Sequence, residues 1–147
     1  MLLESADDRE AVRLSSIELM EATKWDFDSF YLAKHQDMVL VAYFLTGSIG
    51  SAEEVVQESF IRVLERWTRI DDHAAYLRTT VVNRCRSWHR SRRVVLRRES
   101  RLERRGDHHD RPDEMADALQ GLPRRRREVV VLRFYAGLSL ADIATVL

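Results

Sequence analysis

The 147-residue sequence contains a single cysteine, Cys85, and it lacks any long apolar run. One cysteine excludes an internal disulfide and a cysteine-rich zinc site, and it agrees with a cytoplasmic location. The longest apolar stretch, Met38 to Leu45, is less than half of the roughly 20 residues that span a bilayer, so membrane insertion is not expected. Three acidic side chains within the first eight residues give the wrong charge for a secretory signal.

Motifs for catalysis are also missing. The sequence contains no Gly-rich phosphate loop, no set of spaced metal ligands and no nucleophile placed beside a base. We therefore expect neither an enzyme nor a cofactor. The pair His108-His109 does not predict a metal site, because adjacent helical residues point to different sides and no third ligand is suitably spaced. Cys85 falls on an apolar stripe, which predicts a packed thiol.

The net charge of zero conceals an uneven distribution. Residues 1–61 carry 12 acidic and 4 basic side chains, a net charge of −8, whereas residues 62–147 carry 12 and 20, a net charge of +8. The densest basic segment, Arg84 to Arg105, contains ten arginines. Such a segment favours a polyanionic partner. On charge alone, a solvated linker is an equally good interpretation.

Apolar residues recur every three to four positions and strand-like alternation is absent, so the sequence predicts an all-α fold. We expect an N-terminal helical bundle, joined by a basic linker to a partial C-terminal helix-turn-helix module. The expected parts are an extension (1–24, a short helix or a loose segment), the bundle (25–91), the linker (92–112, helical in its first half) and the incomplete helix-turn-helix domain (113–147).

Capping residues suggest where the helices begin. Ser51 is the predicted N-cap of the second bundle helix, and Glu54 would complete a capping box. Asp71 or Asp72 would cap the third helix, and Ser139 the last. The expected helices are 25–45, 51–67, 74–89, 113–119, 124–135 and one that begins at 140.

The second bundle helix is the most informative. Ile61 lies among polar residues, away from the apolar side of this helix. Periodicity alone leaves two interpretations, an ordinary amphipathic helix with one stray isoleucine or a face that docks a partner. The stripe expected to be buried comprises Ala52, Val55, Val56, Ser59, Phe60, Val63, Leu64 and Trp67.

Several segments, taken in order, resemble one protein family. The segment Ala52-Glu-Glu-Val-Val-Gln-Glu-Ser-Phe60 resembles the polymerase-clamp helix of bacterial RNA polymerase sigma factors of the extracytoplasmic-function class. The segment Ala75-Tyr-Leu-Arg-Thr-Thr-Val-Val-Asn83 resembles the helix that recognises the minus-ten promoter box, and residues 122–147 resemble the start of the minus-thirty-five domain. The first bundle helix resembles the first conserved helix of the same family, through Phe27, Phe30, Tyr31 and His35. Among subgroups, the sequence is most similar to the sigma-E-like proteins of actinobacteria.

The resemblance implies a sigma factor that binds core RNA polymerase and directs promoter recognition, DNA melting and transcription initiation. Core RNA polymerase and promoter DNA are the expected partners, and an anti-sigma factor is a further candidate. The implied polymerase-binding residues are Glu54, Gln57, Glu58 and Ile61. The implied DNA-binding residues are Arg69, Ile70, Asp71, Arg78, Asn83, Arg84, Arg86 and Arg90, with Asn83 placed to contact a base edge and the later arginines to contact phosphates.

Two departures from the family pattern bear on this interpretation. Glu54 stands where the family usually has Asp, which keeps the charge. The sequence stops before the recognition helix that would enter the major groove, so the C-terminal module is expected to be truncated. Two alternatives therefore stay open: a truncated decoy that occupies polymerase or an anti-sigma partner, and a stand-alone helix-turn-helix regulator that binds duplex DNA.

Overall fold

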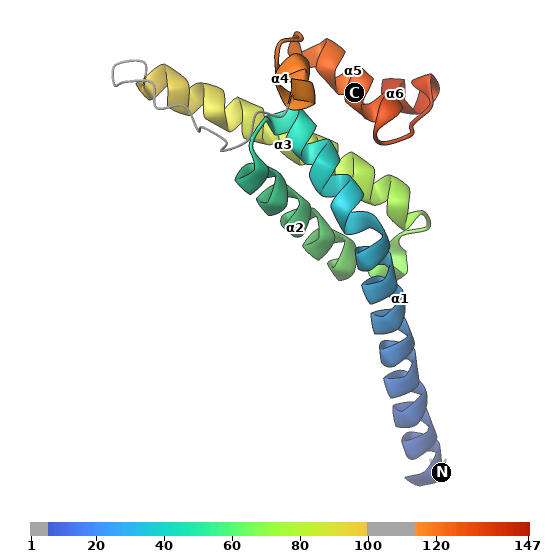
Figure 1. The fold of residues 1–147 in the computed structure, drawn as a ribbon. Helices are drawn as coiled ribbons and strands as arrows, with labels where there is room; N and C mark the ends of the chain where they lie inside the picture. The colour runs from blue at the N-terminus through green and yellow to red at the C-terminus, as the bar shows by residue number, and fades with distance from the viewer. Residues whose placement is uncertain (1–5, 100–113) are drawn as a thin grey trace. The chain divides into compact units, whose positions relative to one another are not determined.

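The computed structural model describes residues 6–99 and 114–147, and within these ranges the regular structure is entirely helical (Figure 1). This confirms the predicted all-α fold. The chain divides into two compact units, residues 1–33 and residues 34–147. None of the helices in the described ranges combines the length and the apolar character needed to cross a membrane.

The first helix, α1, runs from Ala6 to Thr46. The sequence predicted a helix from residue 25 and left the preceding segment open, and the structure makes that segment helical from Ala6 onward. In the first unit, the rings of Phe27 and Tyr31 lie 6.4 Å apart along this helix. The helix ends where Gly47 adopts a φ of +75°, a left-handed conformation that glycine enters without a Cβ penalty.

The second helix, α2, spans Ile49–Glu65 and begins two residues before its predicted cap, Ser51. Ser48 is the N-cap, with an extended backbone, and its side-chain oxygen accepts a hydrogen bond from the Ser51 amide at 3.3 Å. The prediction that Ser51 is the cap is therefore wrong, because Ser51 already lies in the first turn. The two serines are equally suited by residue type, and the left-handed Gly47 decides between them by placing Ser48 directly before the helix.

Most of the predicted α2 stripe is buried. Ala52, Val55, Val56, Ser59, Phe60 and Val63 are buried as expected. The prediction was wrong for Leu64, which is 50% exposed. Trp67 is half-buried in the short 3-10 helix η1 (Trp67–Arg69), where its ring stacks on His73 with centroids 3.7 Å apart.

The third helix, α3, spans His73–Glu99 and is longer than predicted. Asp72 caps it, since its Oδ1 accepts a hydrogen bond from the Ala75 amide at 3.0 Å. Helical spacing predicted that the inward face of this helix comprises Ala74, Leu77, Val81, Cys85 and Trp88. Leu77, Val81 and Cys85 are buried, whereas Ala74 and Trp88 are only half-buried. The helix continues into the segment predicted as a linker. The remainder of that segment, including the His108-His109 pair, lies outside the described residues.

The second unit has its core where the later part of α1 meets α2 and α3. Burying one large apolar side chain contributes about 1.5–3 kcal/mol, so this layer fixes the relative positions of α2 and α3. The buried apolar residues of these three helices are Met38, Val41, Ala42, Phe44, Leu45, Ala52, Val55, Val56, Phe60, Val63, Leu77, Val81, Val82 and Cys85.

Three shorter helices follow: α4 (Glu114–Gln120), α5 (Arg124–Phe134) and α6 (Leu140–Val146). Ser139 caps α6 as predicted, accepting a hydrogen bond from the Asp142 amide at 3.1 Å. The sequence also placed Phe134 on the apolar side of the 124–135 helix together with Val129, Val130 and Leu132. That prediction was wrong for Phe134, which is 76% exposed. Val131 and Leu132 are the fully buried apolar residues of α5.

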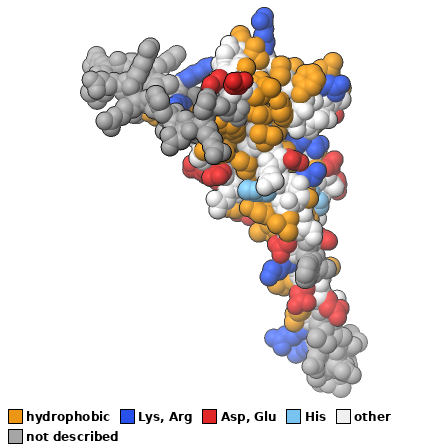
Figure 2. Space-filling model, in the orientation of Figure 1, with side chains coloured by type: hydrophobic (Ala, Val, Ile, Leu, Met, Phe, Trp, Pro, Cys, Tyr) orange, Lys and Arg blue, Asp and Glu red, His pale blue; other side chains and the backbone are white. Residues whose placement is uncertain are grey.

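The C-terminal helices contact the end of α1. The rings of Phe44 and Tyr135 lie 4.6 Å apart, and the Gln120 side-chain amide donates a hydrogen bond to the Phe44 carbonyl at 3.1 Å. Figure 2 shows hydrophobic side chains gathered on the visible face where α4, α5 and α6 lie in Figure 1. The C-terminal helices therefore pack against the last turn of α1.

Candidate nucleic-acid interface

The four residues predicted to bind polymerase share one exposed face of α2. Glu54, Gln57, Glu58 and Ile61 are spaced by three and four residues, which places them on the same side of a helix. Ile61 is 50% exposed, as is Leu64, which adjoins it on the next turn. The sequence argument missed Leu64 because its position also fits the edge of the buried stripe.

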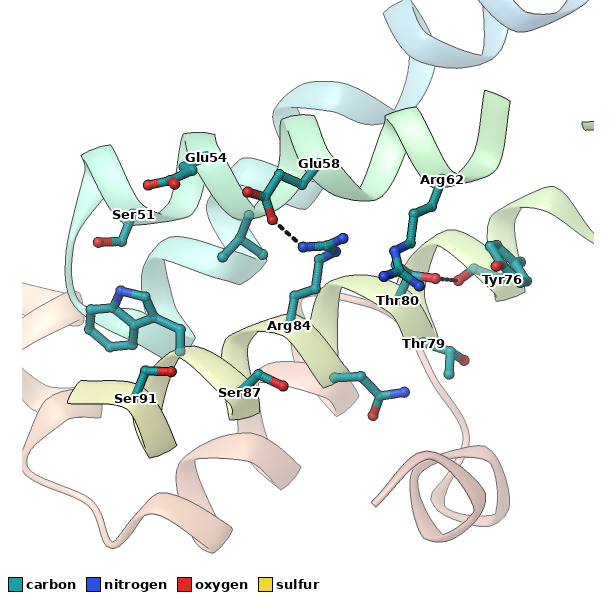
Figure 3. A pocket seen from close by; sticks show the side chains of 13 residues that line it. Ser51, Glu54, Glu58, Arg62, Tyr76, Thr79, Thr80, Arg84, Ser87 and Ser91 are labelled. Atoms are coloured by element: carbon teal, nitrogen blue, oxygen red, sulfur yellow. Dashed lines mark hydrogen bonds and ion pairs between the residues drawn. The ribbon is translucent and has the colours of Figure 1, made fainter. Parts of the chain in front are cut away.

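Glu58 also forms an ion pair with Arg84 of α3 (Figure 3). The sequence argument placed these residues on separate surfaces, one for polymerase and one for DNA. The structure instead brings the two surfaces together along the seam between α2 and α3. Because both side chains remain partly exposed, the pair contributes at most about 1 kcal/mol and can exchange for other partners.

A groove of about 590 Å³ follows this seam (Figure 3). Glu54, Glu58 and Arg62 line it from α2, and Asn83 and Arg84 line it from α3. Hydroxyl groups on α3 add further hydrogen-bonding capacity. They belong to Tyr76, Thr79, Thr80, Ser87 and Ser91.

A second open cavity, of about 640 Å³, lies at the connection between α2 and α3. It brings together Arg69, Ile70 and Asp71, three of the predicted DNA-binding residues. His73 anchors this connection. Its Nε2 donates a hydrogen bond to the Trp67 carbonyl at 2.8 Å, and its ring stacks on Trp67.

Tyr76 lines both the groove and the cavity at the connection. Tyr76 was not among the predicted DNA-binding residues, although it is an aromatic residue four positions after the predicted cap Asp72. Thr79 likewise lines both spaces. Tyr76 is the aromatic ring among the residues that line the cavity, which makes it the side chain suited to stack on a base.

The remaining predicted DNA-binding residues are distributed along α3. Arg78 is half-buried, and Asn83 is exposed. Arg90 is exposed and donates a hydrogen bond to the Ser87 hydroxyl at 3.2 Å. Arg86 is instead turned toward the C-terminal helices, where its Nε lies 3.7 Å from Glu128 Oε1. The structure therefore separates Arg86 from the groove that holds Asn83 and Arg84.

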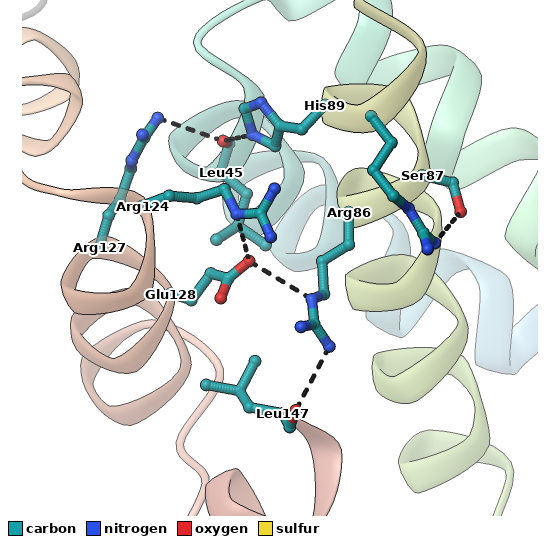
Figure 4. A network of polar contacts seen from close by, with 9 residues as sticks. Leu45, Arg86, Ser87, His89, Arg124, Arg127, Glu128 and Leu147 are labelled. Atoms are coloured by element: carbon teal, nitrogen blue, oxygen red, sulfur yellow. Dashed lines mark hydrogen bonds and ion pairs between the residues drawn. The ribbon is translucent and has the colours of Figure 1, made fainter. Parts of the chain in front are cut away.

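Arg86 belongs to a polar network around the last turn of α1 (Figure 4). The carbonyl of Leu45 accepts hydrogen bonds from His89 Nε2 at 2.7 Å and from Arg127 Nη1 at 3.5 Å. Carbonyls at the end of a helix lack helical partners, so these side chains satisfy an otherwise unpaired acceptor. Burial lowers the pKa of His89, and Arg127 and Arg124 lower it further, while the bond to Leu45 opposes the shift.

Cys85 is 1% exposed on α3. Burial raises the pKa of its thiol to about 12, and the nearby Glu128 carboxylate contributes in the same direction. The thiol is therefore protonated near neutral pH and packs as an apolar group, as predicted. Across residues 6–99 and 114–147, no three His, Cys, Asp or Glu side chains are grouped to hold a metal ion.

Comparison with known proteins agrees with this architecture. The family model Sigma-70 region 2 matches residues 30–95, and the model Sigma-70, region 4 matches residues 113–147. The RNA polymerase sigma-E factor of Streptomyces coelicolor is 25% identical over 130 residues, covering 83% of this chain and 73% of that protein. No solved structure matches the chain. With its regions 2 and 4 in family order, the chain belongs to the RNA polymerase sigma factors of the extracytoplasmic-function class, which direct promoter recognition and transcription initiation.

Proposed function

We propose that the exposed face of α2 binds core RNA polymerase, and that the connection after α2, together with α3, recognises the melted minus-ten strand. The observation that carries this proposal is the cavity of about 640 Å³ at the connection. Three residues selected from the sequence for DNA contact, Arg69, Ile70 and Asp71, line it together.

A base can be contacted on its edge and its faces only after it leaves the duplex stack, so strand recognition needs a pocket that receives it. Ile70 and Tyr76 supply apolar and aromatic surface for the base, while Arg69 and Asp71 supply a donor and an acceptor for its edge. Capturing an extruded base in this way also favours the melted promoter over the closed duplex.

Along α3, Arg78, Arg84 and Arg90 are proposed to contact the phosphates of the same strand, which position a strand without identifying its sequence. Asn83 is exposed in the groove between α2 and α3, where its amide can donate to and accept from a base edge. Arg86 joins this set once its contact with Glu128 is released.

On α2, Ile61 and Leu64 form a small apolar area beside the acidic residues Glu54 and Glu58. Binding energy at interfaces concentrates in desolvated apolar residues, whereas surrounding charges guide the encounter and select the partner. We propose that Ile61 and Leu64 are desolvated against polymerase, and that the carboxylates pair with basic residues there.

The double variant Ile61→Arg, Gln57→Ala tests the polymerase face. We expect its affinity for core polymerase to fall by at least about tenfold, since truncating a desolvated residue at the centre of an interface typically costs about 2 kcal/mol or more. Leu40→Arg is the matched control, because Leu40 is an exposed apolar residue of α1 that lies outside this face. The measurement is co-elution and fluorescence anisotropy with purified core enzyme. Equal affinity of the double variant and the wild type would refute the assignment.

We also propose that the protein acts by binding rather than by catalysis, in the cytoplasm, where bacterial polymerase and promoter DNA occur. An anti-sigma factor that covered Ile61 and Leu64 would exclude polymerase by competition, so we propose such a protein as a third partner.

A further inference from the structure

A smaller cavity, of about 210 Å³, lies between α3 and α5. Asn83, Arg86, Ser87 and Arg90 line it from α3, and Arg124 lines it from the first turn of α5. Every lining side chain is polar, and three of the five are guanidinium groups. The space is several times the roughly 30 Å³ that one water molecule occupies.

The charges around this cavity are not balanced. Among the described residues, Glu128 is the acidic side chain that pairs with Arg86 and Arg124, and it is buried. Its Oε1 lies 3.7 Å from Arg86 Nε and 3.5 Å from Arg124 Nε, longer than ordinary charge-assisted hydrogen bonds. Three arginines against one carboxylate leave a net charge of about +2 around a partly open cavity, in which Asn83, Ser87 and Arg90 are exposed.

Donor capacity around the cavity is also unused. Arg124 Nη1 is enclosed and has no hydrogen-bond partner. The two carboxylate oxygens of Glu128 are likewise buried without a hydrogen-bond partner, so the ion pairs with Arg86 and Arg124 leave donor capacity on the guanidinium groups for a further acceptor. Figure 4 shows the Arg124 and Arg86 side chains both extending toward the same carboxylate oxygen of Glu128.

We propose that this cavity binds a phosphate group, held by α3 and α5 together. Guanidinium groups match phosphate oxygens in a planar, bidentate geometry, and a dianionic phosphate balances the residual charge of about +2. The Ser87 hydroxyl and the Asn83 amide supply neutral donors for the remaining oxygens. The phosphate belongs either to a small phosphorylated molecule or to the backbone of a DNA strand.

This site differs from the proposed promoter surface by including Arg124, and it does not require that surface to function. A phosphate bound to both helices stabilises the contact of α5 with α3, because a ligand that binds only the folded, packed form shifts the equilibrium toward it. The same phosphate contacts Asn83, Arg86 and Arg90, three residues proposed to contact promoter DNA.

Thermal unfolding and calorimetry with inorganic phosphate test the proposal on the full chain. At matched ionic strength, we expect phosphate to raise the melting temperature of the wild type above its value in chloride. Arg124→Gln should weaken phosphate binding by at least about tenfold, as expected for the loss of a charge-assisted contact. Arg125→Gln is the matched control, since Arg125 is the exposed neighbour outside the cavity, and its affinity should stay within about twofold.

A short single-stranded oligonucleotide, titrated against the same variants, identifies the source of the phosphate. Weaker phosphate binding with unchanged strand binding in Arg124→Gln indicates a small phosphorylated molecule, and a loss of both indicates a strand phosphate. Ser87→Ala repeats the comparison without changing a buried group, and circular dichroism checks the fold of each variant. If phosphate stabilises the wild type no more than chloride does, or if Arg124→Gln and Ser87→Ala bind both probes like the wild type, the proposal is overturned.

Discussion

Tyr76 lies where the cavity at the α2–α3 connection meets the groove along α3. If its ring stacks on a strand base, Tyr76→Ala should remove about 1–3 kcal/mol of strand affinity, a decrease of roughly 5- to 150-fold. Tyr76→Phe keeps the ring and should bind within about twofold of the wild type. The measurement is anisotropy of a labelled pool of single-stranded oligonucleotides with reconstituted holoenzyme. Wild-type affinity in the alanine variant would remove Tyr76 from the proposed site.

His89 gives the protein a predictable dependence on pH. Its Nε2 must carry a proton to donate to the Leu45 carbonyl, and Arg124, Arg127 and Glu128 of α5 lie near the ring. Its pKa is lowered from 6.5, mainly by burial, so the unfolded chain binds a proton more readily than the folded one. The free energy of unfolding therefore decreases as the pH falls below about 6.5, by at most about 1.4 kcal/mol per pH unit for this single group.

Urea unfolding at pH 7.5 and pH 5.5 measures this effect. His89→Gln is the comparison, because glutamine can donate to the same carbonyl and does not titrate. The wild type should lose more stability than the variant between the two pH values. Equal losses would show that His89 does not contribute.

Among the helices, α2 begins at a different N-cap residue from the one that the sequence predicted, Ser48 instead of Ser51. Ser48→Ala should destabilise the protein by about 1 kcal/mol, since it removes the acceptor for the Ser51 amide. Ser51→Ala, the residue first predicted as the cap, should change the stability by less than about 0.5 kcal/mol. Chemical denaturation of both variants measures the difference. A larger loss in Ser51→Ala than in Ser48→Ala would restore the sequence-based assignment.

Local sequence signals predicted the helices and most of their buried faces. The stripes of α2 and α3 follow from helical spacing, and the Asp72 and Ser139 caps follow from residue type. The packing of α5 did not follow from the sequence, because Arg127 and Glu128 resemble solvated surface charges in a run of arginines. Both are buried, and each has a partner at least 40 residues away in the chain, Leu45 of α1 for Arg127 and Arg86 of α3 for Glu128. Contacts of that kind depend on tertiary structure and leave no local pattern.

The residues of the candidate site were also predicted where a local sequence signal existed and missed where exposure depends on tertiary packing. Ile61 was identified because it interrupts a polar face, and Arg69, Ile70 and Asp71 because they belong to a family segment. Leu64 was missed because a position at the edge of a stripe is exposed or buried according to the neighbouring helix.

Across the whole molecule, the acidic and basic halves of the sequence do not form two independent surfaces. Glu58 of α2 pairs with Arg84 of α3, and Glu128 of α5 pairs with Arg86 of α3. Part of the basic charge of α3 is therefore neutralised within the protein. Binding to a nucleic-acid strand has to replace these internal partners with phosphates.

Glu128→Gln tests this competition through the salt dependence of strand binding. Each phosphate neutralised on a single strand contributes about 0.7 to the slope of log affinity against log salt concentration. Releasing Arg86 should therefore steepen the slope by about 0.7 and raise the affinity at low salt. Asp117→Asn removes the same charge from an exposed position on α4, away from Arg86, and should leave the slope unchanged. The measurement is anisotropy with a single-stranded oligonucleotide between 50 and 200 mM salt, roughly the range over which such effects are large. Identical slopes for Glu128→Gln and the wild type would mean that Arg86 contacts no phosphate in the complex, and Arg86 would then leave the proposed DNA-binding set.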